Sequence, residues 1–524
     1  MPPRLLHPDE YELVGRESEE SNETFDLDEA DFQSQGLTST SYLNQRRSRI
    51  PLVFSRITPA RLRGLFSARN RNSRGPPKAT QLPRRRIGLH RPSRRICFVF
   101  PFVILVILAF LVLTALFRPS YTNPPAHYRV LRERVESSED SGRANPEKQK
   151  IFIAASIYDE GGHLLGGYWG EALLDLIDLL GNKNVYLSIY ENSAGEAAQT
   201  AYFKFDREVQ CPHTIVYEDP PPLDDFPQIK LPDGTKRTKR VAYLAEARNK
   251  ALEPLAENPE TKYDKLLYLN DAVFDPVEAA QLLLSTNLDE HGQPSYRAAC
   301  AVDFINPFKF YDTYATRDLE GYSMGVPFYP WFSNAGNGLS RADVLAGKDA
   351  VRVKSCWGGM AAFDAKPFQA DPPLRFRATE DVYWDASECC LIHADLLSQG
   401  TFEEDGDYVG VFMNPYVRVA YDNTTLSWLL TVQRIESMFT IPHNIVNHIV
   451  GLPWFNPRRT EVAGSQVEEE VWTPDKSLEA GGSFKKQNRE AKGDGYCGRR
   501  ALQVIKETPR NGEKNWESMP IPSG

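Results

Sequence analysis

Short apolar runs alternate with stretches of helical periodicity from Lys150 onward, and this alternation predicts the fold. Continuous apolar runs are typical of strands buried on both faces, whereas apolar residues three and four positions apart are typical of helices. The predicted strands are Ile151–Ile157, Val185–Tyr190, His213–Tyr217 and Leu266–Leu269, and the predicted helices are 164–180, 202 onward and 239–255. The alternation indicates an α/β fold with a mostly parallel sheet and helices on both faces.

The second half of the folded body, which is predicted to span 150–524, has a mixed pattern. Ala299–Asp303 and Val417–Tyr421 have the composition of strands, and a loop-rich region with Pro, Gly and aromatic residues lies between them. After Trp454 the chain becomes polar and Gly-rich. Residues 460–490 are therefore predicted to be irregular.

One apolar run is much longer than any strand. Ile96 to Phe117 contains 22 residues and no charged side chain, which is long enough for a helix to cross a bilayer. It lies too far from the start for a cleaved signal peptide. From Arg46 to Arg95 there are 16 basic residues and no acidic ones, so the positive-inside rule predicts a cytoplasmic N-terminus. The sequence thus predicts a single-pass type II protein of the Golgi or another secretory-pathway membrane, with residues 118–524 in the lumen.

The flanks of this run complete the predicted domain organisation. Residues 1–95 change from acidic and Ser-rich to Arg-, Pro- and Ser-rich with little apolar content, which predicts a disordered cytoplasmic tail. Its basic part is expected to lie near anionic membrane lipid. Residues 118–149 are charge-rich and contain Pro124-Pro125, and they are predicted to form a stem.

Charge is distributed unevenly along the 524 residues. The net charge is −9, but residues 1–95 hold 18 Lys and Arg against 11 Asp and Glu, a sum of +7, so the remainder carries −16. Binding to nucleic acid phosphates requires a positive surface. The body is therefore not expected to bind nucleic acid.

The cysteines and one sequon fit a secretory location. Six of the seven cysteines follow the long apolar run, and six cysteines allow 15 full pairings that sequence does not distinguish. The adjacent Cys389 and Cys390 are not a CxxC zinc pair, which favours a disulfide or a core position. Asn423-Thr424-Thr425 is an N-glycosylation sequon and makes Asn423 a candidate modification site.

Candidate chemistry lies at the ends of the predicted strands, where ligands of open α/β sheets bind. Asn270-Asp271 follows the run Leu266–Leu269, while Tyr158 and Glu191 follow two other strands. An acid in this position can hold a divalent metal against a phosphate. The same pattern also fits an ordinary turn before Pro276.

Other candidates are isolated polar residues, because no Walker loop, GxGxxG, HExxH or GxSxG motif is present in the sequence. Arg248 and Asn249 lie late in a predicted helix, where a guanidinium either grips a diphosphate or forms a helix salt bridge. Glu388 and His393 are able to reach a metal or a sugar hydroxyl. A lone His is more often structural.

Ten motifs in a fixed order make the resemblance to a known family specific. The chain resembles the fungal capsule-associated and cryptococcal α-1,3-mannosyltransferases, glycosyltransferase family 69, over nearly the whole body. The motifs are IFIAASIYDE, VYLSIYEN, KRVAYLAEARNKAL, LLYLNDAVF, CAVDF, FYDTYATRDLEG, SCWGGMAAFDA, SECCLIHAD, NPYVRVAY and GYCGRRALQV.

The resemblance implies a GT-A-like type II membrane glycosyltransferase that moves mannose from GDP-mannose to a mannose-containing glycan acceptor. It implies a retaining α-1,3 transfer, a divalent cation such as Mn²⁺, and a role in cell-surface or capsular polysaccharide synthesis. The family's metal-binding motif falls on Asn270 and Asp271, and its Arg-Asn pair on Arg248 and Asn249. The other motif residues are Tyr311, Asp312, Arg317, Asp318, Glu388, Cys389 and Cys390.

These positions imply roles. Asp271, with the metal, neutralises the leaving GDP, and Arg248 supports the same diphosphate. Glu191 or Tyr158 contacts the nucleoside. The sugar and acceptor pocket is shaped by Trp357, Asp312 and Asp318, and Asn249, Asn270 and Trp357 are further candidates for binding the nucleotide-sugar. With Asp271 and Arg248, the catalytic candidates are Asp312, Asp318 and Glu388, and the candidate metal ligands are Asp271 and His393.

Two departures keep a second hypothesis open. The family commonly has a polar residue where this chain has Gly358. The segment after Ile189 usually carries acids and a Trp in the family, and here it reads Glu191 to Ala198. The alternative is a non-catalytic scaffold for polysaccharide assembly or export on a transferase fold. A glycosidase would need two carboxylates flanking a glycosidic bond, and the sequence gives no means of pairing its acids.

Overall fold

The computed structural model describes residues 94–159, 161–191, 196–217, 222–231, 234–399, 403–404, 407–475, 477–478, 481–507 and 514–522. The predicted tail therefore lies outside the described residues except for its last two positions, and Glu160 and residues 192–195 also lie outside them. The chain divides into two compact units. Of the described residues, 94–110 belong to one unit and those from Leu111 onward belong to the other.

Helix α2 runs Arg94–Phe117, over the segment that was predicted to cross a membrane. A spanning helix must be both about 20 residues long and apolar throughout. Across the ranges of the chain that the structure describes, no helix satisfies both conditions. The prediction of a single-pass type II protein of a secretory-pathway membrane, with a lumenal body, is therefore wrong.

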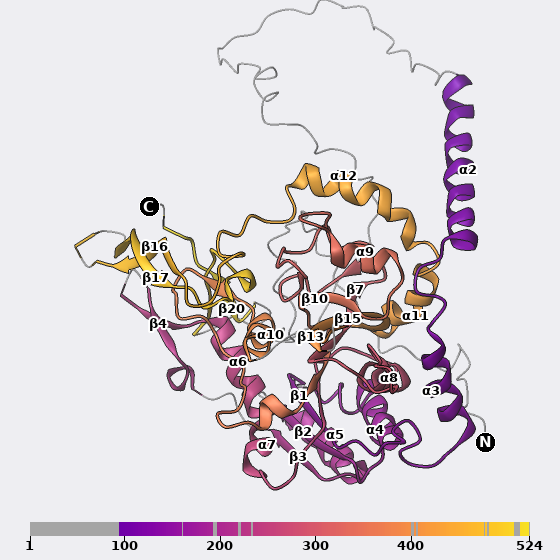
Figure 1. Ribbon diagram of the computed structural model, residues 1–524, viewed down its shortest axis with the longest axis horizontal. Helices are drawn as coiled ribbons and strands as arrows, with labels where there is room; N and C mark the ends of the chain where they lie inside the picture. The colour runs from indigo at the N-terminus through magenta and orange to yellow at the C-terminus, as the bar shows by residue number, and fades with distance from the viewer. Residues whose placement is uncertain are drawn as a thin grey trace, which may run out of the picture. The chain divides into compact units, whose positions relative to one another are not determined.

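One large sheet forms the centre of the larger unit. Its ten strands among the described residues include the path β3-β2-β1-β6-β11-β7-β15-β10-β9, and β8 pairs with β7. Figure 1 labels β1, β2, β3, β7, β10 and β15 of this sheet. These strands are β1 Ile151–Ile157, β2 Val185–Glu191, β3 His213–Tyr217, β6 Lys265–Leu269, β7 Ala298–Asn306, β8 Lys309–Phe310, β9 Arg317–Asp318, β10 Val351–Ser355, β11 Met360–Asp364 and β15 Val411–Ala420. The first four strands of the path are parallel, and β11 runs antiparallel between β6 and β7.

Alternate residues of each central strand face two separate hydrophobic cores. Ile151 and Ile153 belong to one core, together with residues of α4 (Tyr168–Leu180), α5 (Glu196–Glu208) and α8 (Pro276–Ser285). Phe152 and Ala154 belong to the other, together with residues of α6 (Arg240–Lys250) and α10 (Glu388–Ser398). A strand that is apolar at every position must be covered on both faces. The predicted α/β fold with helices on both faces is confirmed.

The remaining elements surround this centre. The helices are α3 Ala126–Ser137, α7 Glu253–Glu257, α9 Leu339–Leu345, α11 Asn423–Val432 and α12 Thr440–Val450, with 3-10 turns η3 Leu223–Asp225, η4 Lys366–Gln369, η5 Glu436–Phe439 and η6 Gly495–Cys497. Five two-stranded pairs complete the fold. They consist of β4 Gln228–Lys230 with β5 Lys236–Thr238, β12 Asp385–Ala386 with β18 Gly498–Arg499, β13 Glu403–Glu404 with β14 Asp407–Tyr408, β16 Gln466–Pro474 with β17 Gly482–Glu490, and β19 Gln503–Ile505 with β20 Trp516–Ser518.

Two predicted segments differ from the structure. The helix predicted over 239–255 is divided into α6 and α7, because Pro254 lies in the first turn of α7 and cannot donate to a preceding turn. The irregular structure predicted for 460–490 is wrong, since β16 and β17 form a regular antiparallel hairpin there. Opposite charges face one another in this hairpin, as in Glu470 opposite Lys486.

Candidate functional site

The candidate site begins where β6 ends. Every residue of β6 is buried, and Asn270 is also buried, but the next residue, Asp271, is partly exposed. Strands β1 and β2 run parallel to β6, and Ile157 of β1 lies opposite Glu191 at the end of β2. Asp271 therefore places a carboxylate within reach of solvent at the sheet edge where ligands of α/β proteins bind.

Asn270 is held by hydrogen bonds from several elements. Its Oδ1 accepts from Arg248 Nη1 at 3.2 Å and from Trp357 Nε1 at 3.1 Å. Its backbone N–H donates to the carbonyl of Gly359 at 2.9 Å, and its own carbonyl accepts from Trp169 Nε1 at 2.9 Å. The residue before Asp271 is thus fixed through both its backbone and its side chain.

Arg248 lies beneath Asn270 in the protein interior. Its side chain is 1% exposed, and its Nε donates to Glu388 Oε1 at 3.1 Å. The guanidinium also stacks on the ring of Trp357, 4.3 Å from the ring centre, in a cation–π contact. Burial lowers the pKa of Arg248, but Cys389 and Glu388 outweigh this effect and hold it above its usual value. Arg248 forms a buried ion pair, and not the solvated helix salt bridge that the sequence left open.

Glu388 reaches this ion pair from the first turn of α10. The helix begins after Ser387, whose side chain accepts from the backbone N–H of Cys389, which is an N-cap. The Cys389 thiol donates to Glu388 Oε1 at 3.4 Å, and burial raises its pKa well above the usual value, so the thiol stays protonated. Glu388 is therefore the counterion of Arg248, and Cys389 donates a hydrogen bond to Glu388.

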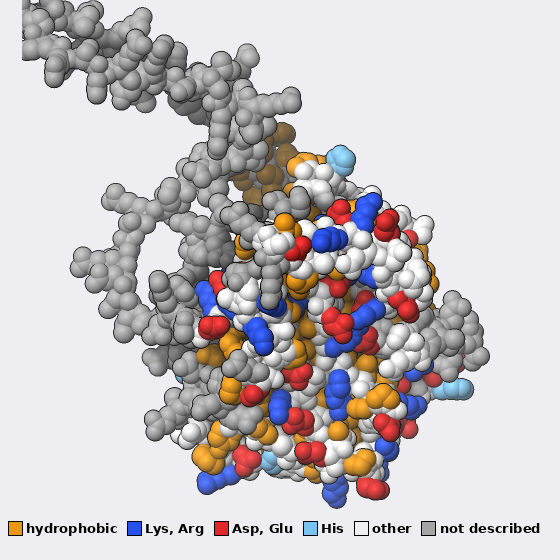
Figure 2. Space-filling view, turned by 90° about the vertical axis from the view of Figure 1, so that its left-hand side faces the viewer, with side chains coloured by type: hydrophobic (Ala, Val, Ile, Leu, Met, Phe, Trp, Pro, Cys, Tyr) orange, Lys and Arg blue, Asp and Glu red, His pale blue; other side chains and the backbone are white. Residues whose placement is uncertain are grey.

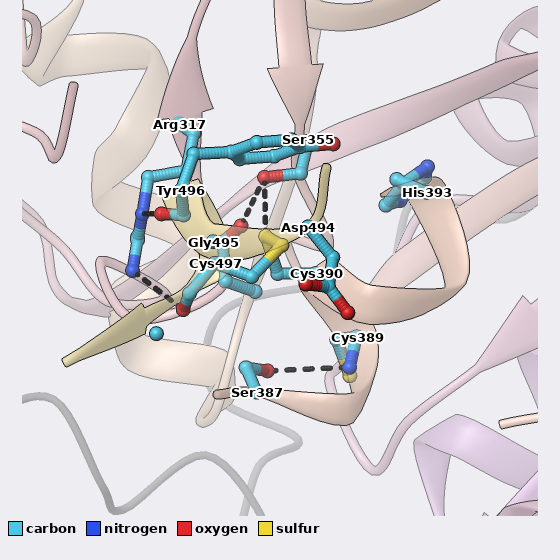
Figure 3. The surroundings of a disulfide bond; sticks show 12 residues. Arg317, Ser355, Ser387, Cys389, Cys390, His393, Asp494, Gly495, Tyr496 and Cys497 are labelled. Carbon is cyan, nitrogen blue, oxygen red and sulfur yellow. Dashed lines mark hydrogen bonds between the residues drawn. A yellow bond between two sulfur atoms is a disulfide. The ribbon is translucent and has the colours of Figure 1, made fainter. Parts of the chain in front are cut away.

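Helix α10 is tied to the C-terminal part of the chain beside the site. Cys390 forms a disulfide with Cys497, and the Arg317 guanidinium donates to the carbonyls of Tyr496 and Cys497 at 2.8 and 3.0 Å (Figure 3). A second disulfide joins Cys300 to Cys356. Arg317 thus has a structural position, with five backbone carbonyls around it.

Two buried carboxyl groups lie near the end of β7. Asp303 Oδ1 accepts from the backbone N–H of Asp312 at 3.0 Å, and Asp303 Oδ2 accepts from the Tyr421 hydroxyl at 2.9 Å. Burial raises the pKa of Asp303 to about 6. Burial, followed by the charge of Asp303, raises the pKa of Asp312 to about 8. Asp312 is therefore protonated at neutral pH.

Two tyrosines connect these acids with Asp271. The rings of Tyr311 and Tyr421 lie 4.7 Å apart. Burial is the main cause that raises the pKa of each phenol, and the charges of Asp271 and Asp303 raise both further. Since these charges act on the same two phenols, Asp271, Asp303 and the tyrosines belong to one polar cluster.

Gly358 and Gly359 connect this cluster with Asn270. Both have positive φ, +57° and +66°, and a Cβ on Gly358 would lie 2.0 Å from the carbonyl oxygen of Ala301. The N–H of Gly358 bonds to Asp312, while the carbonyl of Gly359 accepts from Asn270. The backbone here requires glycine, so the departure at Gly358 is explained by close packing and gives no support to a retired site.

His393 lies apart from the carboxylates, among apolar groups. It is fully buried, its Nε2 donates to the carbonyl of Cys356 at 2.6 Å, and its ring stacks on Phe363. Burial lowers its pKa to about 4. The sulfurs of Cys300 and Cys356 are close enough to share a metal with it, but they are joined in a disulfide. His393 thus lies beside this disulfide, and its role as a metal ligand stays a prediction.

Asn249 and Asp318 have local bonding roles. Asn249 exchanges two hydrogen bonds of 2.9 Å with the backbone of Phe376. Asp318 accepts from the backbone N–H groups of Glu320 and Tyr322, and burial raises its pKa to about 6. Their predicted contacts with the nucleotide-sugar and the acceptor stay predictions.

The other predicted residues lie where their strands and helices place them. Tyr158 is half-buried after β1, while Glu191 is fully buried and accepts from the N–H of Asp159 at 3.1 Å. Asn423 is exposed at the start of α11. Sequence reasoning missed Trp169 and Tyr421. Tyr421 ends a predicted strand, which was a usable signal, whereas nothing in the sequence marked Trp169.

The comparison with protein families agrees with the ordered motifs. The family model described as Cryptococcal mannosyltransferase 1 matches residues 150–395, just under half of the chain. The match includes every candidate site residue from Tyr158 to His393 and excludes Asn423. The matched segment is thus similar to the family that the ordered motifs indicated.

Solved structures give only distant matches. A mannosyltransferase from Pyrobaculum calidifontis, in complex with GDP-Man and Mn²⁺, is 12% identical with a TM-score of 0.29, over 63% of this chain and 71% of that one. Mannosyl-3-phosphoglycerate synthase from Rubrobacter xylanophilus is 12% identical with a TM-score of 0.27, over 71% of this chain and 93% of that one. A search of curated proteins found no match.

Proposed function

We propose that this protein transfers mannose from GDP-mannose to a mannose-containing glycan acceptor, with a divalent metal such as Mn²⁺. We further propose a GT-A-type site, retaining α-1,3 transfer, and a role in cell-surface or capsular polysaccharide synthesis. The observation that carries the proposal is the partly exposed Asp271 at the end of a buried strand, inside the segment that matches a mannosyltransferase family.

The residues at this edge fit a hard divalent cation. Carboxylate oxygens are the ligands that Mg²⁺ and Mn²⁺ prefer, and Asp271 offers one at a partly exposed position. Asp303 is less suitable, because both its oxygens already accept hydrogen bonds. Asp271 would hold the metal, which when bound draws negative charge from the diphosphate leaving group.

The surrounding residues orient this carboxylate and limit the charge beside it. Asn270, Arg248 and Trp357 fix the chain before Asp271. Asp312 keeps its proton at neutral pH, since its pKa is about 8, and so it adds no negative charge near a bound diphosphate. Tyr158 and Glu191, at the ends of β1 and β2, remain the candidates for nucleoside contact.

The test is transfer by the purified protein. Wild type is incubated with GDP-mannose, Mn²⁺ and a panel of mannose-containing acceptors, and mannosylated product is measured. Asp271→Asn is expected to lower transfer by about 100-fold or more, the usual effect of losing one essential electrostatic group. Glu260→Gln, at an exposed acid outside the site, is the matched control and should transfer normally.

Two results would contradict the proposal. Undiminished, Mn²⁺-dependent transfer by Asp271→Asn would remove the central role of that carboxylate. GDP binding by wild type without transfer to any mannoside would favour the scaffold hypothesis.

A further inference from the structure

We propose that Asn270 is a positioning residue that orients Asp271 and does not itself touch the nucleotide-sugar. The inference rests on the proposed function and assigns Arg248, Glu388 and Trp357 to the same task. It concerns how this chain uses an amide beside its metal-binding carboxylate.

The hydrogen bonds of Asn270 turn it toward the protein. Its Oδ1 takes two donors, and its backbone N–H and carbonyl are both bonded to other segments. The two donors fix the orientation of the amide, because Arg248 and the Trp357 indole have no acceptor to offer Nδ2. Among the residues that the structure describes, Nδ2 has no hydrogen-bond partner, and the whole residue is 2% exposed. The amide is thus buried, and its oxygen is directed at Arg248 and Trp357.

These bonds act on the peptide that leads to Asp271. The carbonyl of Asn270 belongs to that peptide unit and is held by the Trp169 indole at 2.9 Å. The N–H on the other side is held by Gly359. With the backbone fixed on both sides, the Asp271 carboxylate leaves the strand in a set direction, as a metal ligand requires.

Charge explains why residue 270 is an amide. The Arg248 guanidinium is buried and already has one buried carboxylate, that of Glu388. An Asp at 270 would reproduce the Oδ1 acceptor but bury a second negative charge against Arg248, next to Asp271. Arg240 is the other buried cation that interacts with Glu388. An unbalanced buried charge is strongly unfavourable. Removing the charge of Glu388 should therefore make Asp tolerable at 270.

This charge exchange gives the test. Transfer is measured for wild type, Asn270→Asp, Glu388→Gln and the double variant, with kcat, KM for GDP-mannose and the Mn²⁺ concentration for half-maximal rate. Each single variant is expected to lower kcat about 10- to 100-fold, the usual effect of losing a group that orients a metal ligand. The single variants should also raise the Mn²⁺ requirement while KM for GDP-mannose stays the same. The double variant should recover most of the lost kcat and most of the increase in Mn²⁺ requirement. The control is Asn258→Asp, at an exposed amide, which should change neither kcat nor the Mn²⁺ requirement.

Other outcomes would overturn the inference. A double variant as slow as Asn270→Asp would mean that the amide N–H groups contact the ligand. A lower Mn²⁺ requirement in Asn270→Asp would mean that residue 270 binds the metal. If Asn270→Asp does not fold, Trp357→Phe removes one donor to Oδ1, and a raised KM with unchanged kcat in that variant would equally reject positioning.

A separate measurement distinguishes failure of this inference from failure of the proposed function. If wild type transfers no mannose, the proposed function fails, but the charge balance still predicts thermal stability. Asn270→Asp and Glu388→Gln should each lower the Tm. The Tm of the double variant should be higher than the value obtained by adding the two single decreases. Strictly additive changes in Tm would show that residues 270, 248 and 388 do not form the proposed charge-balanced group.

Discussion

Gly358 has a conformation and a location that a residue with a side chain cannot share. Its φ of +57° lies in the left-handed region, and a Cβ would meet the backbone carbonyl of Ala301 at 2.0 Å. The overlap is with backbone, so no side-chain rotation relieves it. The N–H of this residue also bonds to Asp312, which links the backbone constraint to the site.

Gly358→Ala is expected to lower the free energy of unfolding by at least about 3 kcal/mol, the sum of a left-handed Ala and an overpacked contact. Gly292→Ala is the matched control, because Gly292 has φ +74° with nothing within 4 Å of a Cβ. Gly292→Ala should lower the free energy of unfolding by only about 1–2 kcal/mol, because Ala is strained in the left-handed conformation. Urea denaturation measures both values. Equal losses would show that the contact with Ala301 has no effect.

Asp312 makes stability depend on pH. Its folded pKa of about 8 lies above the value of about 3.9 for an unfolded Asp. Between these values the folded state binds more protons than the unfolded state. Its contribution is therefore fully present below pH about 4 and is lost as the pH rises through about 8.

Asp312→Asn should flatten this decline, by at most about 1.4 kcal/mol for each pH unit between about 4 and 8. The measurement is urea denaturation of both proteins across that range. Glu260→Gln, at an exposed acid, should keep the wild-type slope. Identical slopes for Asp312→Asn and wild type would mean that the carboxyl is ionised in the folded protein.

The chemistry of single residues was visible in the sequence, but their partners were not. Asp271 was identified because it follows a buried run, although the same pattern also fitted an ordinary turn, and the structure places it partly exposed directly after β6. Arg248 was assigned to a diphosphate, yet its neighbours are Glu388, distant by 140 residues, and Asn270. Contacts across such separations depend on how helices pack, which local pattern does not specify.

At the scale of elements, prediction succeeded where burial alone decided the pattern. β1 has the predicted bounds, because a strand covered on both faces is apolar throughout and ends abruptly. β3 also has its predicted bounds, although it lies at the sheet edge and its residues are partly exposed. The hairpin of β16 and β17 was missed, since charged residues occupy both faces and no apolar alternation is present. Its two strands are stabilised by pairing with each other, with Trp472 opposite Phe484, and such pairing is not local in sequence.

Helix α10 shows how one element serves both the site and the core. Its first turn places Glu388 against Arg248, its next residues place Cys390 in a disulfide, and its later residue His393 lies in the interior. The stretch SECCLIHAD was singled out for its polar residues. Glu388 bonds to Arg248, whereas His393 bonds to the backbone of Cys356. A helix turns its residues to different sides, so neighbours in sequence enter different environments.

At the scale of the whole molecule, the C-terminal segment is bonded to the helix that carries Glu388. The disulfide Cys390–Cys497 joins residues 107 positions apart, and Arg317 bonds to the same C-terminal segment. On the face drawn in Figure 2, acidic and basic side chains are interspersed and neither sign forms a broad patch. Residues 496–497, which lie beyond the family match, help to hold α10 in place.

Loss of the Cys390–Cys497 crosslink should destabilise the protein more than loss of Cys300–Cys356. The closed loops contain 107 and 56 residues, and loop-closure entropy gives about 5 and about 4 kcal/mol respectively. The variants are Cys390→Ala/Cys497→Ala and Cys300→Ala/Cys356→Ala, compared by urea denaturation. The first pair should also lower mannosyl transfer, because it frees the helix that carries Glu388.

The control is Cys211→Ala, which removes a buried sulfur without breaking a crosslink. Subtracting its effect leaves the part due to the crosslink itself. Hydrogen exchange then locates the change. Faster exchange in α10 and in residues 495–505 is expected for the first pair, since these segments lose their covalent connection. Unchanged exchange there would mean that Arg317 and the surrounding packing alone hold the C-terminal segment against α10.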